Sequence, residues 1–346
     1  MPEAAGFSSP TGRATSLAKN KAGFPEAGSP LFRLARRTAF FALTAWLLGT
    51  AGGFLVATCQ AAGKAPAFLE TELAPVADPA LRGELAAVAA DFAAAVTDKT
   101  LARFGRKHAH RRTDLLAAPP QEYRDRIRAD ALAKLLGAGM DPALDQYFVY
   151  ADRNPATQIL FLAYYDAGNR RVVLLGTDFI SSGKLRPGDD SFLTPLGAFE
   201  HLPDHWGYRA EGTKNAKGWR GLGAKGSRVW DFGYQQAPRQ FRQGVYDSQM
   251  RLLMHATDPD NGEPRLGGPD SKGCVRVSAA ANAFLDRRAI LDRHYEKIAA
   301  EEKDRDMWLL RADRSPVAHL GSYLVVGDSA ILSAARAEPQ TAPTPQ

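Results

Sequence analysis

Three closely spaced β-rich runs constrain the fold of this chain more than any other feature. They cover residues 147–150, 158–164 and 171–175, and two turn-forming segments, Asn154-Pro155 and residues 166–169, separate them. Runs rich in β-branched and aromatic residues, broken at short intervals by turn residues, predict neighbouring strands of a compact antiparallel sheet. We therefore expect a mainly β fold with flanking helices, of the α+β class.

Helical patterns precede this β-rich region, over residues 65–140. Asp78-Pro79 supplies an N-cap and a first helical position for a segment that continues to Phe104. Pro119-Pro120 interrupts the pattern, and a second, charged amphipathic helix then ends at Gly137. We interpret residues 65–140 as a small helical subdomain or spacer.

The N-terminal region has the composition of an export signal. Residues 1–30 are rich in Gly, Ser, Pro and Ala and are predicted to be disordered, as is the Pro/Thr/Ala tail over residues 335–346. Arg33, Arg36 and Arg37 precede an uncharged apolar run of 21 residues, 38–58. This length can span a bilayer, and the arginines place its N-terminal side in the cytoplasm. Residues 31–62 are thus a predicted signal peptide or membrane anchor.

Three fates of this segment remain open. Small residues near Cys59-Gln60-Ala61 suit cleavage, whereas retention of the segment would leave a single-pass anchor. Lipidation at Cys59 is the third, because Val56-Ala57-Thr58-Cys59 resembles a lipobox. All three place the rest of the chain outside the cytoplasm, in the periplasm or cell envelope.

The net charge of +6 does not indicate a nucleic-acid partner. Six of the 44 Lys/Arg and two of the 38 Asp/Glu lie in residues 1–63, so that this leader alone carries +4. The remainder is close to neutral, whereas nucleic-acid binding requires a basic patch on the folded domain.

Cys274 is the candidate nucleophile of the chain. The sequence has two cysteines, and removal of the leader with Cys59 would leave Cys274 without a disulfide partner. It lies in Ser271-Lys272-Gly273-Cys274-Val275-Arg276, and His255 precedes it by 19 positions at the end of an apolar run. A lone thiol with a separate histidine is a candidate nucleophile with its base. We predict no metal: a zinc site would need further ligands, and Pro203 disfavours a helix that would bring His201 and His205 together.

Four ordered motifs resemble the L,D-transpeptidase (YkuD-like) catalytic domain. They are Ser181-Ser182-Gly183, Thr194-Pro195-Leu196-Gly197-Ala198-Phe199, Met254-His255-Ala256-Thr257 and the segment from Ser271 to Arg276, with fifteen residues between His255 and Ser271. The resemblance implies a YkuD-like β-sandwich over about residues 145–330. Two positions depart from the family pattern: Ala256 replaces the usual glycine, and Lys272 replaces the usual histidine before Gly-Cys. The loops between Phe199 and Arg251 are also long.

The chemistry of these residues predicts their roles. His255 is the expected general base and acid for the Cys274 thiol. Lys272 and Arg276 add positive charge, which is expected to favour the thiolate. Gly273 permits a tight turn whose amides face a developing oxyanion, and Ser271 orients the loop or the histidine. Six residues are also candidates for contact with the substrate: Arg276, Lys272, Thr194, Gly197, His201 and His205.

The resemblance also implies a substrate and a reaction. Cys274 is expected to attack the amide after the diamino acid of a peptidoglycan stem peptide and to release D-alanine. An acceptor amine of a second stem would then resolve the thioacyl-enzyme, giving a cross-link in cell wall biosynthesis without a cofactor. Two alternatives stay open at this point. One is an L,D-carboxypeptidase or amidase of the same fold, and the other is a non-catalytic, envelope-anchored peptidoglycan-binding protein.

Overall fold

A mixed β-sheet forms the centre of the structure, a computed structural model that describes residues 65–104 and 112–337. The order of its strands is β4-β9-β1-β2-β3-β8-β7-β6-β5. The strands are β1 (Gln146–Asp152), β2 (Ile159–Asp166), β3 (Arg171–Ser181), β4 (Gly197–Glu200), β5 (Tyr208–Arg209), β6 (Arg228–Phe241), β7 (Gly244–Ala256), β8 (Val275–Val277) and β9 (Tyr323–Gly327). The predicted leader, the apolar run 38–58 and nearly all of the predicted tail lie outside the described residues. Within the described residues, no helix is long and apolar enough to cross a membrane.

The sheet differs in two ways from the expected antiparallel sandwich. β1 pairs with β9, and β7 with β8, in parallel, while the other pairs are antiparallel. The long strand β3 pairs with β2 along most of its length and with β8 at its end, so that one continuous sheet curls instead of dividing into two. The mainly β character is confirmed. The parallel pairs arise because β9 and β8 each return through a long connection.

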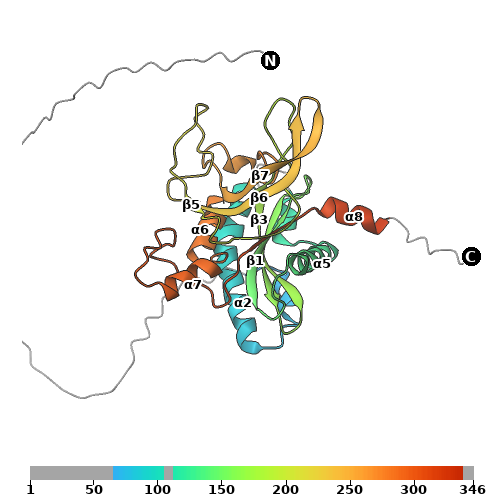
Figure 1. The fold of residues 1–346 in the computed structure, drawn as a ribbon. Helices are drawn as coiled ribbons and strands as arrows, with labels where there is room; N and C mark the ends of the chain where they lie inside the picture. The colour runs from blue at the N-terminus through green and yellow to red at the C-terminus, as the bar shows by residue number, and fades with distance from the viewer. Residues whose placement is uncertain (1–64, 105–111, 338–346) are drawn as a thin grey trace, which may run out of the picture. The chain divides into compact units, whose positions relative to one another are not determined.

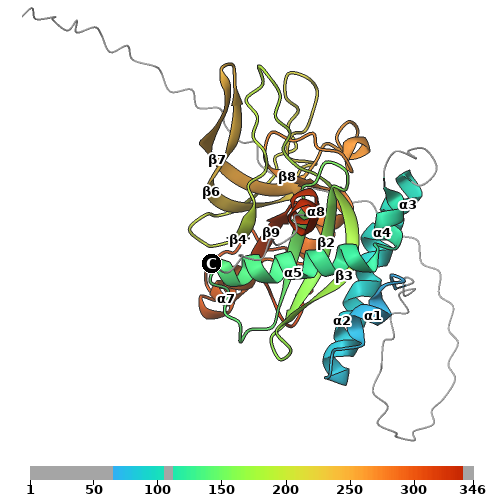
Figure 2. The same cartoon turned by 90° about the vertical axis from the view of Figure 1, so that its right-hand side faces the viewer.

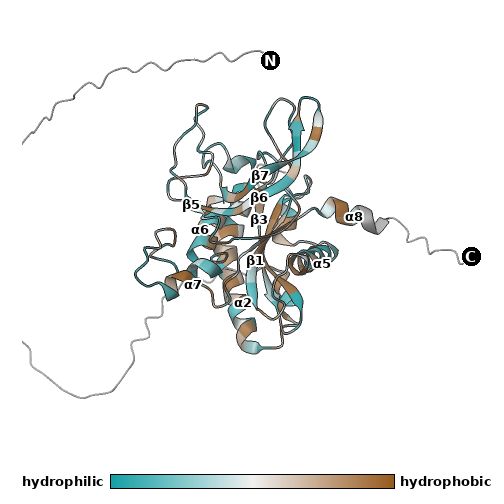
Figure 3. Ribbon diagram, in the orientation of Figure 1, coloured by the Kyte–Doolittle hydropathy of each residue, from teal (hydrophilic) through white to brown (hydrophobic). Residues whose placement is uncertain are grey.

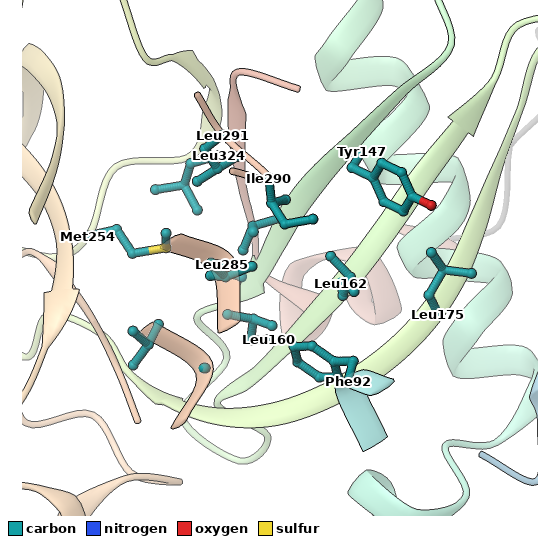
Figure 4. Close-up of a cluster of buried hydrophobic side chains, with 14 of the residues drawn as sticks. Phe92, Tyr147, Leu160, Leu162, Leu175, Met254, Leu285, Ile290, Leu291 and Leu324 are labelled. Carbon is teal, nitrogen blue, oxygen red and sulfur yellow. The ribbon is translucent and has the colours of Figure 1, made fainter. Parts of the chain in front are cut away.

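Both faces of the strands β1 to β3 are buried, which explains their nearly unbroken apolar sequence. Tyr147 and Val149 point into one core, which also contains residues of β6, β7 and β8 from the other half of the sheet. Phe148 and Tyr150 point into a second core on the opposite face. Figure 4 shows the first core, where Leu160 and other strand residues face side chains of the helical segments.

The helices before the sheet pack directly onto it. They are α1 (Leu69–Leu73), α2 (Pro79–Phe92), the π-helix η1 (Ala93–Thr97), α3 (Asp98–Phe104), α4 (Thr113–Ala117) and α5 (Gln121–Gly137). The side chain of Asp78 caps α2 by accepting a 2.8 Å hydrogen bond from the amide of Ala80, as the Asp-Pro pair predicted. Phe92 of α2 packs edge-on against Phe284, 5.0 Å between centroids, and lies against Gly176 of β3.

The two helical segments cover opposite faces of the sheet. α2 contributes to the first core, whereas α5 contributes Ile127 and Leu135 to the second. Figure 1 shows α2 and α5 on different sides of β1, and Figure 2 shows α5 lying across β2 and β3. We expected residues 65–140 to form a separate subdomain or spacer; instead they share both cores with the sheet. An amphipathic helix must bury its apolar stripe, and the exposed faces of β1 to β3 provide the surface for it.

The C-terminal part adds short helices and the closing strand. The helices are α6 (Ala279–Arg287), α7 (Arg293–Glu301) and α8 (Ser329–Ala337), with a 3-10 turn η2 (Glu263–Arg265) before β8. β9 pairs with β1 in parallel and with β4 in antiparallel orientation. The outer part of the β6–β7 hairpin extends away from the helices and is mostly hydrophilic (Figures 1 and 3).

Candidate active site

Adjacent parallel strands bring Cys274 and His255 together. In the β7–β8 pair, Met254 lies opposite Val275 and His255 opposite Arg276. Continued by one residue, this register places Cys274 level with Leu253. Side chains alternate along a strand, so that Cys274 and His255 belong to the same face, while Met254 and Val275 point into the core behind them.

Three motifs that are far apart in the sequence meet behind Cys274. Gly183 forms a parallel bridge with Ser271, and the Oγ1 of Thr194 accepts a 2.8 Å hydrogen bond from the amide of Gly183. The same hydroxyl donates a 2.7 Å bond to the carbonyl of Gly273. A Cβ added to Gly183 would lie 2.2 Å from the carbonyl oxygen of Phe192 and 2.9 Å from the Cα of Gly273. Only glycine allows these three backbones to approach so closely.

The hydroxyl of Ser271 holds the shape of the loop that leads to Cys274. It donates a 2.6 Å hydrogen bond to the carbonyl of Cys274 and accepts a 3.0 Å bond from the amide of Gly273. Ser271 thus bonds to the loop and not to His255. Because the Gly273 amide is already bonded to Ser271, this amide does not point at an oxyanion, in contrast to our expectation for the turn.

Gly273 has a backbone conformation that favours glycine. Its φ is +138°, and an added Cβ would lie 2.8 Å from Cε of Met250 and 3.1 Å from Cβ of Phe192. The residue thereby allows the chain to turn into β8 against two side chains that are already packed.

The Cys274 residue is partly exposed, but its thiol is packed among protein atoms, and this desolvation is the largest effect on the pKa of the thiol. Its Sγ lies 4.0 Å from the backbone carbonyl of Arg251, to which the thiol donates. Burial raises the pKa of Cys274 above that of an ordinary cysteine, while the Leu253 amide and the Arg276 guanidinium partly offset that rise. The positive charge that we expected to favour the thiolate is therefore outweighed by desolvation, and the thiol is protonated at neutral pH.

His255 is buried and neutral, with one ring nitrogen fixed. Its Nδ1 lies 2.6 Å from the carbonyl oxygen of Ala256, and burial lowers the pKa of the ring to about 4. A carbonyl only accepts hydrogen bonds, so Nδ1 carries the proton and Nε2 has the free lone pair. The base is thus held in the tautomer that accepts a proton from a thiol.

Ala256 is accommodated where the family usually has glycine. A Cβ on Gly223 would come within 2.7 Å of the Ala256 Cβ, so that glycine at position 223 leaves the space for this methyl group. Gly223 also lines a cavity of about 550 Å³ together with Tyr208, Lys214 and Trp219. This cavity lies beside the His255 end of β7 and is formed by the long loop after Phe199.

The two basic residues of the cysteine motif have different surroundings. Arg276 is largely buried. Its guanidinium donates a 3.1 Å hydrogen bond to the backbone carbonyl of Asp270 and also lies close to the carboxylate of Asp270. Lys272 is 59% exposed and pairs with Asp189, 2.5 Å from Nζ to Oδ1. Arg276 is close enough to act on the ionisation of Cys274, whereas the Lys272 ammonium is directed to Asp189.

The other three predicted substrate-contacting residues lie on different elements. His201 is completely buried: its Nδ1 is 2.9 Å from the carbonyl oxygen of Asp231, and its ring stacks on Tyr295 at 4.6 Å. It is a core residue and does not line an open groove. His205 packs over Gly233 of β6, and Gly197 of β4 pairs with Val326 of β9. The prediction that His201 lines the groove is wrong, because packing of this loop against Tyr295 and β6 buries the ring.

Three residues near the thiol were not predicted from the sequence. Asp231 is buried in β6, Arg251 precedes Leu253 on β7, and Tyr208 of β5 is half-buried. The charges of Arg251, Cys274 and Asp231 all act on the Tyr208 hydroxyl, whose pKa is raised, mainly by burial. No motif marks these positions, because the pairing of β5, β6 and β7 brings them together. Within the described parts of the chain, no group of three or more His, Cys, Asp or Glu side chains is arranged to hold a metal ion.

The part of the sheet that bears Cys274 and His255 is similar to a known catalytic domain. Residues 148–292 match the family model described as the L,D-transpeptidase catalytic domain, YkuD. This confirms the predicted resemblance, and the matched residues contain both His255 and Cys274. The matched segment is thus similar to the YkuD catalytic domain, a family that acts on peptidoglycan stem peptides in the cell envelope and that usually depends on a cysteine. No curated protein matches the chain.

Proposed function

We propose that this protein is a cysteine-dependent peptidoglycan L,D-transpeptidase. The observation that carries the proposal is the fixed tautomer of His255, whose Nδ1 is bonded to Ala256 while Nε2 is free on the face that also bears Cys274. We further propose that residues 31–62 export the domain, as a cleaved signal or as an anchor.

In the first half-reaction, Sγ of Cys274 attacks the carbonyl carbon that joins the diamino acid to the terminal D-alanine. The thiol proton passes to Nε2 of His255 as the C–S bond forms, because the resting thiol and imidazole are both neutral. The C–N bond then breaks, and His255 returns the proton to the leaving amine. The product is a thioester between the diamino acid and Cys274, together with free D-alanine.

In the second half-reaction, an amine of an acceptor stem attacks the thioester carbon. His255 takes a proton from this amine, the C–S bond breaks, and the proton returns to the sulfur. The cavity lined by Tyr208 and Gly223 lies next to Ala256 at the end of β7, and we propose that it receives the acceptor chain. Transfer to water at this step would instead give carboxypeptidase activity.

The test is product formation from purified tetrapeptide stems. Intact-mass measurement should detect a thioester on the wild-type chain and none on Cys274→Ala, and cross-linked dimers should appear when an acceptor stem is present. A dimer formed by Cys274→Ala would disprove the proposal. Hydrolysed stems alone, with acceptor in excess, would assign the protein to the carboxypeptidase alternative.

A further inference from the structure

A second guanidinium, that of Arg251, lies on the opposite side of Cys274 from His255. Cys274 is level with Leu253 in the β7–β8 register, and Arg251 and His255 are each two residues from Leu253 along β7. Residues two apart in a strand share a face and are separated by about 6–7 Å. The reacting thiol is therefore flanked by a base on one side and a permanent cation on the other.

Arg251 is held by a carboxylate beneath it. Its Nε donates a 2.5 Å hydrogen bond to Oδ2 of Asp231, and its Nη2 pairs with the same oxygen. Asp231 is completely buried, and its Oδ1 accepts a 2.9 Å bond from the amide of Gly233. A buried carboxylate with two fixed partners positions the guanidinium without taking up all of its donors.

The outer edge of the Arg251 guanidinium is open to solvent. Its side chain is 48% exposed, and no protein acceptor for Nη1 is found among the described residues. Tyr234, which pairs directly with Arg251 across the two strands, is 61% exposed and stands on the same face. The site thus presents an immobilised cation with free donors, next to an aromatic ring, on the surface that leads to Cys274.

The direction of the reaction decides which part of a donor stem reaches Arg251. His255 protonates the leaving amine, so the departing residue lies on the His255 side of the thiol. The acyl part that stays on Cys274 extends the other way, towards Arg251. On the basis of the proposed function, we infer that Arg251 binds a free carboxylate on the acyl part of the donor stem. A fixed guanidinium fork is the group that suits a carboxylate with two oxygens.

The acyl part of a donor stem carries two carboxylates of the kind that a guanidinium binds. Donor peptides amidated at one or the other carboxylate distinguish them. The first is on the side chain of the diamino acid, and the second belongs to the residue before it. Three donor tetrapeptides are needed: one with both carboxylates free, one amidated at the diamino acid and one amidated at the preceding residue. The rate of thioester formation on the full chain is measured by intact mass for each donor.

We expect wild type to lose roughly 10- to 100-fold in kcat/KM with the one donor whose recognised carboxylate is amidated, as for a charge-assisted hydrogen bond. In Arg251→Ala, the ratio of kcat/KM for the free donor to kcat/KM for the amidated donor should fall towards one. Arg251→Lys should retain part of this discrimination. The control is Arg242→Ala, which removes an exposed guanidinium from the turn of the same hairpin and should keep the discrimination. Because Arg251→Ala leaves Asp231 buried and unpaired, the neutral pair Arg251→Gln/Asp231→Asn repeats the measurement without a buried charge.

The outcomes separate this inference from the proposed function. Equal rates with all three donors, or unchanged discrimination in both the Arg251→Ala and the double variant, would overturn the role of Arg251 while thioester formation still supports the transpeptidase. Absence of a thioester with every donor, on protein whose Cys274 is alkylated normally, would overturn both.

Discussion

The hydroxyl of Thr194 donates a 2.7 Å hydrogen bond to the carbonyl of Gly273, the residue before Cys274, and accepts one from the amide of Gly183. One side chain thus fixes two backbones that are 90 positions apart in the sequence. The role of Thr194 is therefore structural support of the cysteine loop, in a buried position that a substrate does not reach.

We expect Thr194→Val to destabilise the fold and to slow acylation. Valine has nearly the shape of threonine but leaves a buried amide and a buried carbonyl unpaired, which costs about 1–3 kcal/mol for each group. Urea unfolding measures the stability, and intact mass measures thioester formation. Thr194→Ser, which keeps the hydroxyl, should recover most of both; a serine variant as impaired as the valine variant would contradict this role.

Gly273→Ala should abolish acylation and reduce stability. The backbone of Gly273 has φ +138°, and the new Cβ would meet Met250 and Phe192. Residues in sparsely populated conformations cost of order 1–3 kcal/mol. Gly218→Ala is the matched control, because Gly218 has φ +77° and open space around it, so that this variant carries backbone strain without crowding. Equal thioester formation by wild type and Gly273→Ala would show that the turn is not required.

Alkylation of Cys274 by iodoacetamide should show an inflection at a higher pH than that of an ordinary cysteine. Burial raises the pKa of this thiol, and Arg276 lowers it in part. Arg276→Gln should move the inflection to still higher pH. Lys272→Gln should leave it in place, because the lysine is exposed and paired with Asp189. A shift with Lys272→Gln as large as that with Arg276→Gln would contradict this assignment.

Acidification should destabilise the protein between about pH 6.5 and pH 4. Burial lowers the pKa of His201 and His255 to about 4, so the unfolded chain binds more protons than the folded one in this interval, and stability falls as pH falls. Each histidine contributes at most about 3 kcal/mol. Asp178 opposes them, because burial raises its pKa to about 6 and the folded state binds its proton more tightly.

Urea unfolding at several pH values measures this dependence. His201→Phe keeps an aromatic ring against Tyr295 and removes one titrating group, so its stability should vary less with pH between 6.5 and 4 than that of wild type. A steeper pH dependence in His201→Phe than in wild type would contradict the assignment of His201 as a buried neutral histidine.

Local sequence determined much of the fold and the identity of the candidate nucleophile. The apolar runs at 147–150, 158–164 and 171–175 lie in β1, β2 and β3, since two buried faces require continuous apolar strands. Asp78-Pro79 begins a helix, because the cap depends on residues that are adjacent in the chain. Cys274 and His255 were recognised from short motifs, and the family match covers both.

Long-range pairing decided the remainder, because register and curl depend on contacts that no local pattern contains. The helices before residue 140 share the cores of the sheet, although their own pattern shows only that one side of each must be buried. His201 is buried against the Asp231 carbonyl of β6, and Arg251 stands beside the thiol through the register of β7 with β8. Burial likewise reversed the expected ionisation of Cys274, since desolvation depends on the packed neighbours of the thiol and not on the charges next to it in the sequence.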